Sequence, residues 1–178
     1  AEGKGYAAVL NAAGNGPGAG TLGLGGGGYG GRGSDRGDFY GGLPYGSLTA
    51  PDLPGSAGHS DPDYDGGDGG GAVRIEAPAG NVTINGIITA NGSSTAGTPP
   101  YYARNGSGGG IFITCLAFAG TNGVLTANAG MTGQQSYGGG GRIAVVYDQS
   151  VQAGMPKSRV LFSTTKGSAA DFSSRNTQ

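Results

Sequence analysis

The sequence predicts an all-β protein, either a β-solenoid or a β-sandwich of short strands, with packed glycine-rich segments and essentially no helix. Glycine supplies 43 of the 178 residues, several times the usual share of roughly 7%. Short apolar segments alternate with polar residues at a period of two, as in strands with one buried face. Nowhere do apolar residues keep a 3.6-residue period over three turns, so helix should be nearly absent.

The first predicted strand unit follows the glycine triplet 69–71. Its opening strand, 72–76, alternates apolar and charged residues, and β-branched residues favour strand over helix. The unit closes with the segment Asn85-Gly86-Ile87-Ile88-Thr89-Ala90-Asn91. We therefore expect a glycine triplet, a strand, a turn, a second strand and a polar exit.

This unit repeats along the chain. The segment 122–128 matches 85–91 at five of seven positions, 37 residues later, and it follows the triplet 108–110 and the strand 111–114. A third opening at 139–147 has no recognisable second half, and 8–14 resembles a closing half without an opening. Such a repeat indicates stacked units that share one core.

Four Asn-Gly pairs occupy the joints between predicted strands, where we expect them to supply positive φ at low cost. These pairs are Asn85-Gly86, Asn91-Gly92, Asn105-Gly106 and Asn122-Gly123.

The segment 14–71 holds 23 glycines in 58 residues and has almost no periodic apolar pattern. It is either a flexible loop or a set of extended, three-residue-per-turn helices of the polyproline-II type, packed backbone to backbone (polyglycine-II-like). The packed form would satisfy its backbone N–H and C=O groups by hydrogen bonds between segments, and we favour it over the flexible loop. Four tyrosines would then lie against glycine faces: Tyr6, Tyr29, Tyr40 and Tyr45.

We expect residues 1–178 to form a single domain, with a half-repeat and glycine-rich segment at 8–71, strand repeats at 72–147, and a C-terminal strand and tail at 148–178. The net charge of −1 and pI near 5.7 argue against a nucleic-acid partner. No apolar run approaches the roughly 20 residues of a membrane span. The first residue is not methionine, as after removal of a signal peptide, which favours an extracellular location.

Three stretches of the sequence carry a family resemblance: Gly28-Tyr29-Gly30-Gly31-Arg32-Gly33, then Tyr45-Gly46-Ser47-Leu48-Thr49-Ala50-Pro51, then Gly139-Gly140-Gly141-Arg142-Ile143-Ala144-Val145. Together with the Thr-Ala-Asn exits, this succession resembles a glycine-rich repeat module of very large surface and secreted proteins of bacteria and protists. The resemblance covers roughly residues 8–147. It implies an extracellular, β-rich, non-enzymatic module of surface architecture or adhesion, with no catalytic residues.

An acidic loop is the candidate metal site. Asp61, Asp63 and Asp65 alternate, with Gly66 next and Asp68 beyond, like the first half of an EF-hand calcium loop. The glutamate expected at position 12 of such a loop is missing. The same residues also make ordinary polar turns, so Ca²⁺ and a plain turn both stay open.

Three sequons for N-glycosylation begin at Asn81, Asn91 and Asn105. Asn105 has the most loop-like surroundings and is our first choice. Asn91 and Asn128 hold matching repeat positions that suit a ladder of stacked asparagines, and a laddered Asn91 could not carry a glycan.

Catalytic groups are scarce, so we do not expect an enzyme. The single histidine, His59, is interpreted as a solvated loop residue. The single cysteine, Cys115, lies in an apolar strand and should be a small buried hydrophobic residue, without an intrachain disulfide. A carbohydrate-active β-solenoid enzyme is the least favoured interpretation.

The incomplete repeats at both ends predict a self-assembling structural subunit of an extracellular filament, sheath or appendage, since unpaired strands invite a second copy. The terminal strands that would be exchanged contain Tyr6, Val9, Leu10, Val160, Leu161 and Phe162. The alternative is an adhesin that binds glycans or a cell surface through aromatic loops at Phe39-Tyr40 and Tyr101-Tyr102.

Overall fold

The computed structural model describes residues 4–21, 25–34, 41–60, 62–63, 65–95, 104–131 and 136–167. Regular secondary structure in these residues is almost entirely strand, with one short helix, α1 (Gln149–Gln152), which confirms the all-β prediction. The six strands are β1 (Ala72–Thr83), β2 (Ile87–Thr89), β3 (Gly110–Ala119), β4 (Val124–Thr126), β5 (Arg142–Tyr147) and β6 (Leu161–Ser163).

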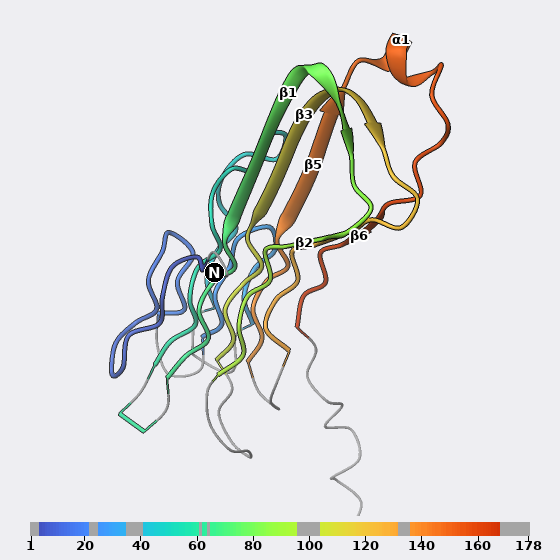
Figure 1. Ribbon diagram of the computed structural model, residues 1–178. Helices are drawn as coiled ribbons and strands as arrows, with labels where there is room; N and C mark the ends of the chain where they lie inside the picture. Colours follow the sequence, from blue (N-terminus) through green and yellow to red (C-terminus); the bar gives the residue numbers. More distant parts are fainter. Residues whose placement is uncertain are drawn as a thin grey trace, which may run out of the picture.

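The strands form two parallel sheets, ordered β1-β3-β5 and β2-β4-β6. Each repeat contributes one strand to each sheet, so the three repeats lie side by side (Figure 1). The third repeat is therefore complete, and the prediction that it lacks a second half was wrong. Its closing strand β6 reads Leu-Phe-Ser, without the Asn-Gly and Thr-Ala-Asn residues that mark β2 and β4.

The predicted closing strand at 8–14 is also absent. This segment forms a turn in which Asn11 has a φ of 56°, and its neighbours are glycine-rich segments that offer no strand to pair with. None of the four Asn-Gly pairs has a left-handed φ, contrary to the prediction. The turn between β3 and β4 uses Gly120 instead, with a φ of 152°.

The glycine-rich segments continue beyond the sheets as extended chain, and they lie next to one another and to the N-terminal part of the chain (Figure 1). Within 55–60, bonds to one neighbour recur at every third residue. Two such pairs of bonds are Gly55 N to Gly70 O with Gly58 N to Gly67 O, and Ala57 N to Asn15 O with Ser60 N to Ala12 O, all at 2.8–3.0 Å. Segments distant in sequence therefore satisfy each other's backbone groups.

These contacts leave no room for side chains. A Cβ on Gly42 would overlap the carbonyl oxygen of Gly18, and one on Gly69 would overlap that of Gly55. Three of the four predicted tyrosine contacts with glycine are confirmed: Tyr6 with Gly16, Tyr29 with Gly46 and Tyr45 with Gly18. Tyr40 lies outside the described residues.

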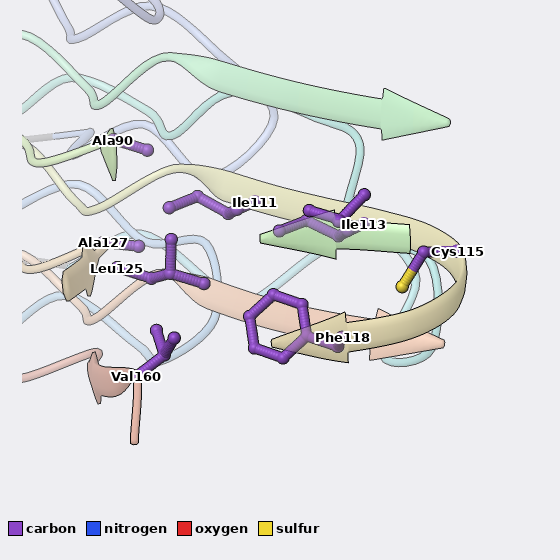
Figure 2. Packing of buried hydrophobic residues seen from close by; sticks show 9 residues of the cluster. Ala90, Ile111, Ile113, Cys115, Phe118, Leu125, Ala127 and Val160 are labelled. Atoms are coloured by element: carbon purple, nitrogen blue, oxygen red, sulfur yellow. The ribbon is translucent and has the colours of Figure 1, made fainter. Parts of the chain in front are cut away.

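The apolar core lies between the two sheets and is centred on β3 (Figure 2). Ile111, Ile113 and Leu125 are fully buried, and Phe118 and Val160 close the core beside them. Because β3 is the middle strand, it is covered on both edges, whereas the outer repeats are covered on one edge only.

Candidate assembly surfaces

Both sheets end on open edge strands. Among the described residues, β1 and β5 each pair only with β3, and β2 and β6 each pair only with β4. We call the surface formed by β1 and β2 the β1/β2 end, and the one formed by β5 and β6 the β5/β6 end. Unpaired strand edges are templates for pairing with another chain.

The apolar core is partly exposed at the same two ends. In one cross-strand row, Ile75, Ile113 and Val145 are aligned by the strand register. The central Ile113 is 0% exposed, while its two neighbours are only partly buried. The row Val73–Ile111–Ile143 has the same pattern. A further strand at either end would remove this apolar surface from water, which stabilises association by about 25 cal/mol per Å² of area buried.

A pocket of about 390 Å³ opens at the β5/β6 end. Its apolar lining consists of Phe118, Val145, Tyr147, Met155, Val160 and Phe162. Gln152, Lys157 and Ser158 are its polar lining residues. The pocket is thus the open end of the inter-sheet core, with polar groups contributed by the segment that contains α1.

The pocket exists because the third repeat is built differently from the first two. Only residues 84–86 connect β1 to β2, and only 120–123 connect β3 to β4, but 148–160 connect β5 to β6. β5 also stops at Tyr147, opposite Cys115, so the second half of β3 has no β5 partner. Helix α1 packs there instead, with an N-terminal cap in which Asp148 accepts bonds from the Ser150 and Val151 backbone.

The outward face of the β2-β4-β6 sheet carries an aliphatic row. Ile87, Val124 and Leu161 are aligned by the register, and the two outer members are 75% and 68% exposed. Ile87 lies at the β1/β2 end and Leu161 at the β5/β6 end. This row is therefore a matched pair of surface markers for the two ends.

An asparagine ladder continues from the same sheet. The Asn128 N–H donates to Asn91 Oδ1 at 2.7 Å, and the Thr165 N–H donates to Asn128 Oδ1 at 2.8 Å. The predicted stacking of Asn91 and Asn128 is confirmed. For the Asn91 N–H itself, the described part of the chain provides no acceptor, so the ladder ends open at the first repeat.

Charges at the β1/β2 end lie on the outer face of the sheet. Arg74 donates to Glu76 at 2.8 Å and lies 3.5 Å from Asp52. The hydrogen bond from Arg74 lowers the pKa of Glu76. The Arg74 guanidinium also lies over the Phe112 ring at 5.9 Å. These charges flank the strand edge without covering the apolar rows on the inner face.

The residues predicted to exchange between copies have other positions. Val160, Leu161 and Phe162 belong to the chain's own β6 region, where β6 pairs with β4 and Val160 is 8% exposed. The interpretation of this segment as a free exchangeable strand was wrong, because the 37-residue step from β4 places it in the third repeat. It nevertheless contributes Leu161 and Phe162 to the β5/β6 end.

The N-terminal candidates are held by their own chain as well. The Tyr6 N–H donates to the Gly55 carbonyl at 3.1 Å, and the Gly69 N–H donates to the Tyr6 carbonyl at 2.9 Å. Val9 and Leu10 stay exposed on the neighbouring turn. The segment thus fills a place in the glycine array and is not a free strand.

The acidic residues of the proposed calcium loop have different surroundings. Asp61 lies outside the described residues, and Asp63 and Asp65 are exposed. The Asp68 carboxylate accepts from Lys4 Nζ and from the Ala8 N–H, both at 2.8 Å. The described residues contain no group of three acidic, histidine or cysteine side chains placed to hold a metal. Calcium stays a prediction from sequence.

The sequons differ in accessibility. Asn105 is 2% exposed, and its Oδ1 accepts from the Thr95 N–H at 3.2 Å. Its choice as the first glycosylation candidate was wrong, because the loop-like sequence around it packs inside the glycine array. Asn91 is engaged in the ladder. Asn81 is exposed on β1 and lies outside the ladder.

The remaining sequence candidates are structural. His59 lies partly buried in the packed segment 55–60, and its backbone N–H donates to the Gly25 carbonyl. The interpretation of His59 as a solvated loop residue was therefore wrong. Cys115 is buried as predicted, and burial raises the pKa of its thiol. The adhesin candidates at 39–40 and 101–102 lie outside the described residues.

The sequence analysis missed Gln152, Tyr147 and the pocket. One signal was present: the spacing between the last two apolar strands is longer than in the earlier units.

Comparison with protein-family models, curated proteins and solved structures finds no match. Across the described ranges, no helix has the length and apolar character needed to cross a membrane.

Proposed function

We propose that this chain is a self-assembling structural subunit of an extracellular filament, sheath or appendage, without catalytic activity. One observation carries the proposal: both sheets are open at both ends, and the apolar rows of the core reach those ends. A chain of this design leaves part of its core uncovered as a monomer, and a second copy covers it. The open surfaces replace the terminal strand exchange expected from sequence.

For the fold, we infer a three-coil β-solenoid whose coils extend into a polyglycine-II array. Two sheets made only of parallel pairs, with a constant 37-residue step in the β2-β4-β6 sheet, support a solenoid over a sandwich. The recurrence of interstrand bonds at every third residue supports polyglycine II, which has three residues per turn. The extracellular location rests on the sequence resemblance and on the low-charge composition.

Electron microscopy and sedimentation of the purified chain test the proposal. We expect assemblies whose length grows with protein concentration, and filaments or sheets in micrographs. A chain that remains monomeric at high concentration and across salt conditions contradicts it. Glycan binding by the same monomer would favour the adhesin alternative.

A further inference from the structure

We propose that copies join head to tail, with the β5/β6 end of one copy receiving the β1/β2 end of the next in the register that the chain already uses internally. The inference rests on the proposed function and specifies its interface. Strand β5 would pair in parallel with β1 of the second copy, and β6 with β2. The occupant of the open β5/β6 end is therefore a second copy of this chain.

The chain makes the required contact twice within itself. In the β2-β4-β6 sheet, Ile87 aligns with Val124, and Val124 aligns with Leu161. One further step places Ile87 of the next copy beside Leu161. The same step in the other sheet places Glu76 beside Val146, because both align with Thr114 within one chain.

The parallel pairing selects this direction over the others. Two identical ends related by a twofold axis would pair their edge strands antiparallel, whereas every strand pair in the two sheets is parallel. Joining unlike ends is a heterologous contact, which produces an open filament when the rotation does not close.

The asparagine ladder supplies a second, independent match. Its rungs follow the rule that a backbone N–H in one repeat donates to the side chain at the equivalent position of the preceding repeat. The first rung, at the Asn91 N–H, has no acceptor among the described residues. The last position is Thr165, whose side-chain hydroxyl would become the acceptor for Asn91 of the next copy.

The side chains at the two ends are compatible with this contact. Inner residues meet in apolar pairs: Val73 of the next copy beside Ile143, and Ile75 beside Val145. Arg74 would lie beside Ala144 on the outer face, where its stem can cover that small side chain. In its own chain, the Arg74 guanidinium lies over the neighbouring Phe112 ring at 5.9 Å. The second half of β1, which has no β5 counterpart, would cover the 390 Å³ pocket.

Cysteine cross-linking of the full chain tests the register. The double variant Ile87→Cys/Leu161→Cys, treated with a short thiol-reactive cross-linker, should give a ladder of covalent multimers on a denaturing gel. A mixture of the two single variants should stop at dimers, and each single variant alone should give none. Cys115 is buried in the parent chain, and Cys115→Ala versions of each variant control for it.

The double variant Glu76→Cys/Val146→Cys tests the register in the other sheet and should also give a series of covalent multimers on the gel. The mismatched pair Ile87→Cys/Val146→Cys joins different sheets and should not. Filaments that cross-link only between identical single variants, or at none of the matched pairs, overturn the register while the structural function stands. A chain that forms no filaments removes both.

Discussion

The side-chain amide of Gln152 occupies the place of a missing strand beside Phe118. Its Oε1 accepts from the Phe118 N–H at 2.8 Å, and its Nε2 donates to the Phe118 carbonyl at 3.2 Å. Phe118 pairs with Val82 of β1 on its other side. One side chain thus satisfies both backbone groups that β5 leaves unpaired when it ends at Tyr147.

Replacement of this amide should loosen the second half of β3. We expect Gln152→Ala to lower the free energy of unfolding by about 1–2 kcal/mol, since two hydrogen bonds are lost, and to speed amide exchange at Phe118. Gln152→Glu is the matched control, because it keeps an acceptor for the N–H but loses the donor to the carbonyl. Unchanged exchange at Phe118 in Gln152→Ala would show that the cap is not formed in solution.

The effect of a glycine-to-alanine substitution on stability should depend on the space around that glycine. Gly42→Ala should destabilise the fold by several kcal/mol or prevent folding, because the added methyl overlaps the Gly18 carbonyl. Gly86→Ala should stay within about 0.5 kcal/mol of the parent, since a Cβ there has nothing within 4 Å and φ is not left-handed. Thermal unfolding of both variants, followed by circular dichroism, measures the difference. Equal melting temperatures would contradict the packed array.

The ladder residue Asn128 should contribute more than its half-buried position suggests. Its Oδ1 accepts from the Thr165 N–H and the Ser163 hydroxyl, both at 2.8 Å. We expect Asn128→Ala to cost about 1–2 kcal/mol and to raise exchange at the Thr165 amide. Asn122→Ala, in the exposed turn before β4, is the control and should change neither quantity. Equal effects of the two variants would mean that the ladder carries no stability.

The fold should weaken in alkali through Tyr45. Burial raises the pKa of Tyr45 to about 12 from a usual value of 10. Between these values the unfolded chain ionises while the folded chain stays neutral, so stability is intact below pH 10 and falls as pH rises toward 12. Urea unfolding at pH 8 to 11.5 measures this, with tyrosinate absorbance as the local probe.

Tyr45→Phe separates that effect from general alkaline unfolding. It removes the ionisable hydroxyl, which bonds the Pro54 carbonyl and accepts from Ser56 Oγ at 2.9 Å. The variant should be less stable by about 1 kcal/mol near neutral pH but should lose less stability on going to pH 11.5. A parallel decline in both proteins would place the sensitivity elsewhere, for example at Tyr29, whose pKa is also raised by burial.

Local patterns predicted the strands of the first two units and the stacking of these units. Alternation around Val73 and Ile75 and the 37-residue repeat identify the first two units, because pairing with a parallel neighbour demands the same pattern in each. The third unit's second strand escaped detection because a sheet requires apolar side chains at its inner positions and does not require the Asn-Gly signature. Phe162, which aligns with the buried Leu125, meets that requirement without the signature.

The candidate surfaces depended on facts beyond local sequence. Asn105 reads as a loop residue, yet its backbone is bonded to Gly27 and Ser136, and that burial comes from partners tens of residues away. Gln152 is an ordinary polar residue until β5 ends and leaves Phe118 without a partner. The sequence predicted unpaired strand edges at the ends of the repeats, but it placed them on the terminal tails.

The glycine array also sets a problem of alignment. The backbone hydrogen bonds of the array recur at every third residue. A glycine segment shifted by three residues would therefore form nearly the same bonds, so backbone bonding alone leaves this degeneracy of register. Side chains break this degeneracy: the ladder asparagines, the inward rows of the sheets, and buried serines of the array such as Ser56, whose N–H donates to Ser107 Oγ at 2.9 Å. Misaligned states would be compact and fully bonded, so they act as kinetic traps. We therefore expect correct folding to require that the strands pair before the glycine segments do.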